Sequence, residues 1–76
     1  MSKKESVYDA VKDIVSRRRA VHRYPECATR RELIDEIAGQ GIAFHELTAI
    51  LDELVQEGKL FCLPTISDQS YYLSKQ

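Results

Sequence analysis

The hydrophobic residues in the first part of the chain recur at the spacing of a helix. Between Lys4 and Arg19, the apolar residues that occur every three or four positions are Val7, Ala10, Val11, Ile14 and Val15. This spacing places them along one face of a helix. Arg18 falls on the same stripe, so we expect either that the helix frays there or that the Arg18 side chain reaches water from the edge of the buried face. Residues 21–28 show no period, and Pro25 favours an extended backbone at Tyr24.

A second helix is indicated by a capping signal. Thr29 and Glu32 have the spacing of a capping box, in which each side chain accepts a hydrogen bond from the other residue's backbone N–H. The apolar residues that follow at helical spacing are Leu33, Ile34, Ile37 and Ala38. We expect the segment from Gly39 to Gly41 to end this helix, because glycine readily adopts the left-handed conformation of a C-terminal cap.

The remaining pattern predicts a third helix followed by a β-hairpin. Residues 44–57 carry apolar side chains at helical spacing, at Phe44, Leu47, Ile50, Leu51, Leu54 and Val55. After Gly58 the period shortens towards two, which predicts strands at residues 59–63 and 71–73 joined by a turn at 64–70. A hairpin alone is marginally stable in water, so we expect it to pack on the helices.

This order of elements resembles that of the winged helix-turn-helix family. The residues that match its turn and third-helix pattern are Ile42, Leu47, Leu51, Leu54, Gly58 and Leu60, and Thr29-Arg30-Arg31-Glu32-Leu33 resembles the start of its second helix. The resemblance covers residues 5–74 and implies a single α+β, mainly α domain over 1–76, with three helices and a C-terminal β-hairpin wing. The turn at residues 38–41 is longer than in the compact form of this motif.

Charge is distributed unevenly along the chain. Residues 1–31 carry nine Lys and Arg against four Asp and Glu, whereas residues 32–76 carry two against eight, within a net charge of −1. Such asymmetry favours an anionic partner for the basic half. The alternative is that two oppositely charged faces balance each other within one small domain.

Six arginines make up the basic half's most concentrated cluster. The residues expected to contact nucleic-acid phosphate are Arg17, Arg18, Arg19, Arg23, Arg30 and Arg31. In the resembled family, this corner can contact the DNA backbone, and the backbone N–H groups that begin the second helix would offer a phosphate seat. The alternatives are ion pairs with acids such as Glu26, Asp35 and Glu36, contact with a partner protein, or no specific role.

The third helix is poorly equipped for the base reading that the resemblance implies. Its candidate base-reading residues are His45, Thr48 and Gln56, and its other outward positions include the four acids Glu46, Asp52, Glu53 and Glu57. No Lys or Arg occurs on it, although bidentate contact with guanine requires one of them. The acids would face a duplex with about one negative charge per 1.7 Å, which opposes docking.

The wing carries mostly apolar and aromatic residues. The candidate protein-interface residues are Phe61, Leu63, Ile66, Tyr71 and Tyr72. A two-stranded hairpin cannot turn all of them inward, so about half should lie on its outer face. An exposed apolar wing is more typical of a contact surface than of a DNA-binding wing, which makes a homodimer or a protein partner plausible.

Other function classes find little support in the sequence. Cys27, Cys62, His22 and His45 lack the paired spacing of a zinc site, so we expect no metal and no cofactor. No grouping typical of a catalytic site occurs, which predicts a non-enzyme with no catalytic residues and no small-molecule substrate. The longest apolar stretches fall far short of a membrane span, and no secretory signal is visible, so we expect a cytoplasmic protein without membrane contact.

Two functional hypotheses follow. The first is a small DNA-binding protein, a transcriptional regulator or accessory factor, that contacts double-stranded DNA through its arginines. The second is a winged-helix module that binds another protein through its acidic third helix or its apolar wing and does not bind DNA. Fold analogy alone does not decide between them.

Overall fold

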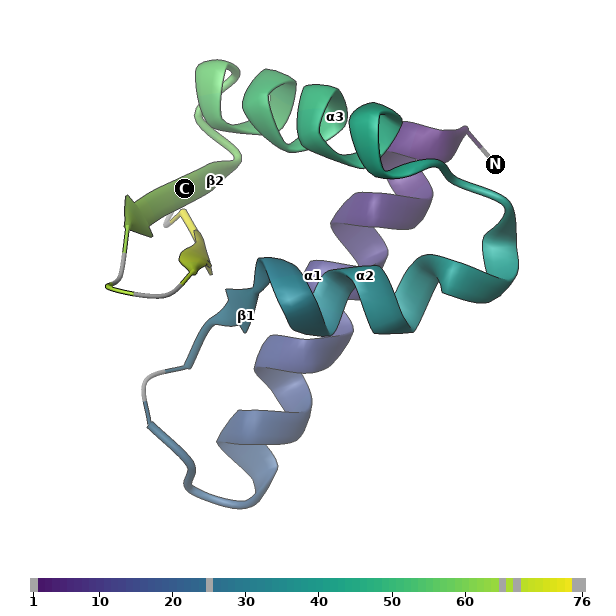
Figure 1. Ribbon diagram of the computed structural model, residues 1–76. Helices are drawn as coiled ribbons and strands as arrows, with labels where there is room; N and C mark the ends of the chain where they lie inside the picture. The colour runs from purple at the N-terminus through teal and green to yellow at the C-terminus, as the bar shows by residue number, and fades with distance from the viewer. Residues whose placement is uncertain (1, 25, 65, 67, 75–76) are drawn as a thin grey trace.

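The computed structural model describes residues 2–24, 26–64, 66 and 68–74. In chain order its elements are α1 (Lys3–Ala20), β1 (Ala28–Thr29), α2 (Arg30–Ile37), the 3₁₀ helix η1 (Ala38–Gln40), α3 (Phe44–Gln56), β2 (Leu60–Pro64) and β3 (Gln69–Leu73). The fold is therefore a small, mainly helical α+β fold with three α-helices and a three-stranded antiparallel sheet. In Figure 1, α2 and α3 cross α1, and the sheet lies at the opposite side of the view from η1.

Helix α1 begins and ends with identifiable caps. The Ser2 hydroxyl accepts a hydrogen bond from the Glu5 N–H, at 3.1 Å. At the other end, His22 has a φ of 54°. The His22 N–H donates to the Arg19 carbonyl and the Arg23 N–H donates to the Arg18 carbonyl, at 3.1 and 2.8 Å. This is a Schellman motif with histidine where glycine is usual, and it extends the helix past the predicted boundary at Arg19.

Helix α2 has the capping box that the sequence predicts. The Thr29 hydroxyl accepts from the Glu32 N–H at 3.2 Å, and the Glu32 carboxylate accepts from the Thr29 N–H at 3.3 Å. The α-helix ends at Ile37, and residues 38–40 continue as η1. The turn is completed by Gly41, whose φ of 73° lies in the left-handed region that glycine adopts without steric cost.

Helix α3 occupies almost the whole segment predicted for it. At its start the Glu46 carboxylate accepts a hydrogen bond from the Ala43 N–H, at 3.4 Å. At its end Gly58, with a φ of 79°, donates to the Val55 carbonyl, and the Lys59 N–H donates to the Leu54 carbonyl. This second Schellman motif turns the chain from α3 into the sheet.

The sheet has one more strand than the predicted hairpin. The strand order is β1-β3-β2, and Ala28 pairs with Tyr71 while Thr29 pairs with Ser70. The prediction that residues 21–28 are irregular throughout was therefore wrong at Ala28. Strands β2 and β3 also begin or end one or two residues away from the predicted bounds, and part of the predicted turn at 64–70 lies outside the described residues.

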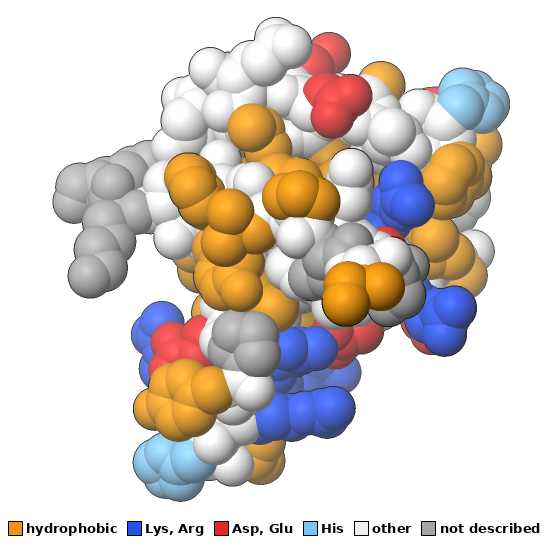
Figure 2. Space-filling view, turned by 60° about the vertical axis from the view of Figure 1, so that its left-hand side comes forward, with side chains coloured by type: hydrophobic (Ala, Val, Ile, Leu, Met, Phe, Trp, Pro, Cys, Tyr) orange, Lys and Arg blue, Asp and Glu red, His pale blue; other side chains and the backbone are white. Residues whose placement is uncertain are grey.

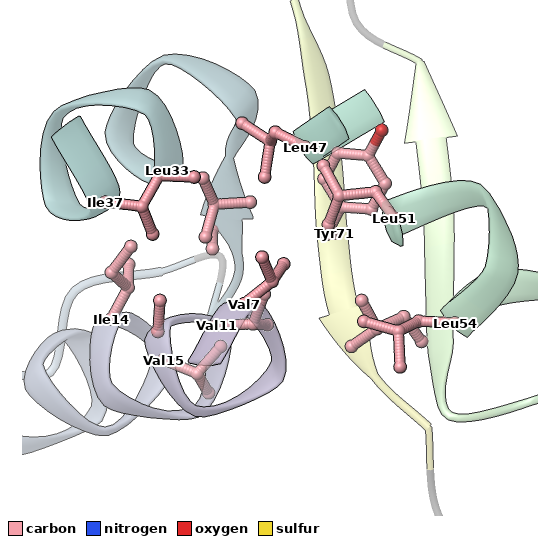
Figure 3. Close-up of a cluster of buried hydrophobic side chains, with 13 residues drawn as sticks. Val7, Val11, Ile14, Val15, Leu33, Ile37, Leu47, Leu51, Leu54 and Tyr71 are labelled. Atoms are coloured by element: carbon pink, nitrogen blue, oxygen red, sulfur yellow. The ribbon is translucent and has the colours of Figure 1, made fainter. Parts of the chain in front are cut away.

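A single cluster of buried side chains joins all three helices to the sheet. Its members are Val7, Ala10, Val11, Ile14, Val15, Ala28, Leu33, Ile37, Leu47, Leu51, Leu54, Leu60 and Tyr71. Figure 3 shows the labelled side chains of α1, α2, α3 and β3 pointing toward one another. Most residues of the helical stripes read from the sequence are thus buried, but Ile34, Ala38 and Phe44, which were expected on the buried faces, are exposed. Burial of the apolar area in this cluster is the main force that holds the fold together.

Candidate functional site

The outer face of α3 is polar and mostly acidic. Among the expected base-reading residues, His45 and Gln56 are exposed, and Thr48 is half-buried with its hydroxyl donating to the Phe44 carbonyl at 3.0 Å. Asp52 and Glu53 are exposed on the same helix. The structure therefore places the three candidate readers on a helix whose accessible charges would repel a nucleic-acid backbone.

Two other acids of this region are held by lysines of α1. Lys3 donates to Glu46 and Lys4 donates to Glu57. Each hydrogen bond lowers the pKa of its carboxyl group below the usual value of 4.5. Both lysines thus favour the ionised form of Glu46 and Glu57, and part of the negative charge of this region is neutralised by the start of α1.

The exposed arginines at the end of α1 form ion pairs within the molecule. Arg17 Nη2 lies 2.7 Å from Glu36 Oε2 and 3.2 Å from Asp13 Oδ2, and the hydrogen bond with Glu36 raises the pKa of Arg17. Arg19 Nε lies 3.1 Å from Glu26 Oε2. These contacts match the alternative in which the arginines pair with neighbouring acids, although surface pairs of this kind add little stability and can exchange partners.

Arg18 lies further inside. Its side chain is only 13% exposed, donates to the Glu32 carboxylate and lies 3.5 Å from the Cys27 sulfur. The helix continues through this position to Ala20, so the alternative that α1 frays at Arg18 was wrong. The Arg18–Glu32 pair connects α1 to the first turn of α2, which is a structural use for a residue expected to contact phosphate.

The start of α2 is already occupied by side chains of the protein itself. The Arg31 N–H donates to Asp68 Oδ2 at 3.1 Å, and the Glu32 N–H donates to the Thr29 hydroxyl. Arg30 Nε lies 3.6 Å from Asp68 Oδ1. Two of the N–H groups expected to seat a phosphate at this helix start therefore already donate to side chains, one of them to the Asp68 carboxylate just before β3.

Only part of the expected arginine cluster remains available. Within the described part of the chain, no carboxylate lies at ion-pair distance from the side chains of Arg23 and Arg31, both of which are exposed. Arg23 lies in the loop after α1, and Arg31 lies in the first turn of α2. The six arginines are thus divided between two regions and are mostly engaged with acids.

The hairpin of β2 and β3, which we refer to as the wing, exposes much of its apolar surface. The exposed fraction is 55% for Phe61 and 44% for Leu63, and Ile66 is fully exposed. Phe61 lies opposite Tyr72 on the neighbouring strand, and Tyr72 is half-buried. Figure 2 shows hydrophobic side chains gathered over the sheet side of the molecule, with Lys and Arg side chains below and beside them. These four residues remain candidates for a protein interface.

Tyr71 does not belong to this surface. Its exposed fraction is 2%, and its hydroxyl donates to Gln69 Oε1 at 2.9 Å. Burial and, after it, the nearby Cys62 together raise the pKa of Tyr71 to about 12. The sequence expectation that Tyr71 is an interface residue was wrong, because in the observed register Tyr71 and Cys62 face the core, while their neighbours Tyr72 and Phe61 lie on the other face of the sheet.

A groove lies where the starts of α2 and α3 meet the wing. We call it the α2–α3–wing groove; its lining residues are Thr29, Arg30, Arg31, Ile34, Phe44, Asp68 and Ser70, and its volume is about 530 Å³. The Phe44 side chain is 56% exposed, and the Arg30 guanidinium carbon lies 5.6 Å from the centre of its ring. Ile34 is also exposed.

Sequence reasoning missed this groove because Ile34 and Phe44 fit the apolar stripes of their helices. A signal for Ile34 does exist. Leu33 and Ile37 lie four positions apart and are both buried, which leaves Ile34 at the edge of that stripe. Phe44 is the first residue of α3, and the buried residues of this helix, Leu47, Leu51 and Leu54, all lie in later turns. The first turn therefore projects past the core.

Histidine, cysteine and acidic side chains of the described residues could in principle form other kinds of site. In that part of the chain, no three His, Cys, Asp or Glu side chains are grouped as metal ligands would be. Both cysteines are free, Cys27 buried and Cys62 half-buried. None of the described helices combines the length and the apolar character that crossing a membrane requires.

Comparisons with known proteins give no match. No protein-family model fits the sequence, and neither a curated protein nor a solved structure is similar to it. The function is therefore inferred from the geometry and charge of this chain alone.

Proposed function

We propose that this chain is a winged helix-turn-helix domain that works as a protein-interaction module. Its element order and its sheet order, β1-β3-β2, support the winged-helix assignment, with β2 and β3 as the wing. Its partner is another protein, which covers apolar side chains on the wing side of the domain.

The observation that carries this proposal is the contrast between the wing and α3. The wing exposes Phe61, Leu63 and Ile66, whereas the outer face of α3 exposes Asp52 and Glu53. Apolar and aromatic side chains are the residues on which protein partners gain binding energy. Carboxylates on the helix that would enter the major groove oppose DNA binding. The surface thus favours the second of the two functional hypotheses.

Site-specific photo-crosslinking in the cells that produce this chain tests the proposal. A photoreactive phenylalanine derivative replaces Phe61, and a matched control carries it at Gln40 in η1, on the opposite side of the molecule from the wing in Figure 1. Because both positions are exposed, neither replacement should disturb the core. We expect discrete adducts from position 61 and none of the same mass from position 40.

The chemical nature of these adducts decides the result. Adducts that protease removes and nuclease leaves intact support the proposal, and mass spectrometry then separates a second copy of this chain from a different protein. Adducts that nuclease removes, or identical adducts from Phe61 and Gln40, contradict it.

A second candidate function is phosphate contact by the two arginines without ion pairs in the described structure. Arg23 and Arg31 are exposed and offer positive charge for a nucleic-acid backbone. Such binding would weaken steeply with salt and would be lost in the double variant Arg23→Glu/Arg31→Glu. The carboxylate of Asp68 beside Arg31 makes this the weaker candidate.

A further inference from the structure

The α2–α3–wing groove combines apolar side chains with one available positive charge. Ile34 and Phe44 line it and are exposed, so a partner's apolar side chain can cover them. Burial of such surface is favourable in proportion to its area, and an aromatic ring in a groove is a typical anchor of a protein interface.

The two arginines of the groove have different roles. Arg30 is held in place, because its guanidinium stacks over the Phe44 ring and pairs with Asp68. The side chain of Arg31, in the described part of the chain, has no carboxylate within ion-pair distance, and only its backbone N–H is bound by Asp68. Arg31 is therefore the group in the groove whose charge a ligand can complement.

Acidic residues in and near the groove restrict the charge of the ligand. Asp68 places a carboxylate inside the groove, and the exposed acids Asp52 and Glu53 lie further along α3. A chain of phosphates would bring several negative charges near these acids, whereas a ligand with a single carboxylate at Arg31 brings only one. An Arg–carboxylate contact can be bidentate, which fixes the orientation of the ligand as well as its position.

The geometry points to a specific occupant of this groove: a peptide segment of a partner protein that presents an aromatic or long aliphatic side chain beside a carboxylate. The apolar side chain lies against Ile34 and Phe44, and the carboxylate binds the Arg31 guanidinium. This inference rests on the proposed function and adds the chemistry of the partner and the place where it binds.

Selection from a displayed library of short random peptides on the immobilised full chain tests this inference. We expect the enriched peptides to contain Asp or Glu next to Phe, Tyr, Trp or Leu. The best of them, synthesised and titrated in solution, should bind Arg31→Glu about tenfold more weakly than the natural chain. The matched control Arg23→Glu has the same net charge and should bind like the natural chain, because Arg23 lies outside the groove.

A charge reversal gives the strictest version of the test. Replacing the peptide's carboxylate by Lys should abolish binding to the natural chain and restore it to Arg31→Glu. A Phe44→Ser variant should lose affinity for both peptides, and circular dichroism establishes that it folds. Enrichment of Lys- and Arg-rich peptides, no enrichment over the bare support, equal binding to Arg31→Glu, or displacement of the peptide by duplex DNA would each overturn the inference.

The outcomes separate this inference from the proposed function. Protein adducts from a probe at Phe61 together with a failed selection leave the interaction module standing and remove the groove as its peptide site. Loss of the protein adducts at Phe61 removes the proposed function itself.

Discussion

The Asp68 carboxylate accepts a hydrogen bond from the backbone N–H of Arg31, with 3.1 Å between Oδ2 and N. This bond ties the wing loop to the first turn of α2, and the same carboxylate lies 3.6 Å from Arg30 Nε. A negative side chain at a helix start is favourable, because the first backbone N–H groups of a helix have no partner within it. This hydrogen bond both positions the wing and places a carboxylate where a phosphate would bind.

Removing this carboxylate should loosen the wing. We expect Asp68→Ala to lower the free energy of unfolding by about 1 kcal/mol, the usual value of a helix-start cap, as measured by urea denaturation. The control Asp35→Ala removes an exposed acid of α2 that makes no such cap, and it should change stability by less than about 0.5 kcal/mol. Equal losses in both variants would show that the Asp68 contact does not stabilise the fold.

Arg18 and Arg19 should differ although they are adjacent. Arg18→Met removes the partner of Glu32 from a mostly buried position, and we expect a loss of about 1–3 kcal/mol because an unpaired, partly buried charge remains. Arg19→Met breaks the exposed pair with Glu26, and it should cost about 0–1 kcal/mol. Urea denaturation of the two variants measures the difference, and a larger loss for Arg19→Met would contradict the burial of Arg18.

The two Schellman motifs allow substitutions of opposite sign. His22 adopts a left-handed φ of 54° at a cost that glycine avoids, so His22→Gly should raise the melting temperature, with a gain of about 1 kcal/mol. Gly58 has a φ of 79°, so Gly58→Ala should lower the melting temperature, with a loss of stability of about 1 kcal/mol. Thermal denaturation compares them, and destabilisation by His22→Gly would mean that its imidazole makes a contribution larger than the backbone cost.

Tyr71 should make the fold sensitive to alkali. Its pKa is raised from 10.0 to about 12, chiefly by burial and then by Cys62, so folding favours the neutral phenol. The stability that this provides is complete below pH 10 and is lost as the pH rises towards 12, where the unfolded state ionises first.

The variant Tyr71→Phe isolates this effect. It loses the hydrogen bond to Gln69, at a cost of about 1 kcal/mol near neutral pH, and it should lose stability less steeply between pH 10 and 12. Burial also raises the pKa of Tyr72, so some alkaline sensitivity should remain. Urea denaturation across this pH range checks it, and parallel curves for the natural chain and Tyr71→Phe would contradict the assignment.

The helices were predictable because their signals are local. Thr29 and Glu32 cap α2 as their spacing indicates, and the apolar stripe of α1 and the leucines of α3 lie in the core. Strand β1 was missed because two residues are too few to show a period. It exists because Ala28 pairs with Tyr71 on a strand that is distant in the sequence, and such pairing leaves no local signal.

The candidate site was less predictable because it depends on which side chains meet. Tyr71 and Tyr72 are adjacent, and only the sheet register decides which of them faces the core. The arginines are close together in the sequence, but the pairing of Arg18 with Glu32 and the capping of the Arg31 N–H by Asp68 arise only in three dimensions. Composition alone therefore overstated the charge available to a nucleic acid.

A titration with duplex DNA at low and at moderate salt, followed residue by residue through the amide resonances, tests the central claim most directly. If the domain works through its apolar surface and groove, the resonances of residues 17–31 and 44–56 should stay in place at both salt concentrations. Saturable shifts in these segments at low salt, weakened strongly at moderate salt, would contradict the account and restore DNA as the partner.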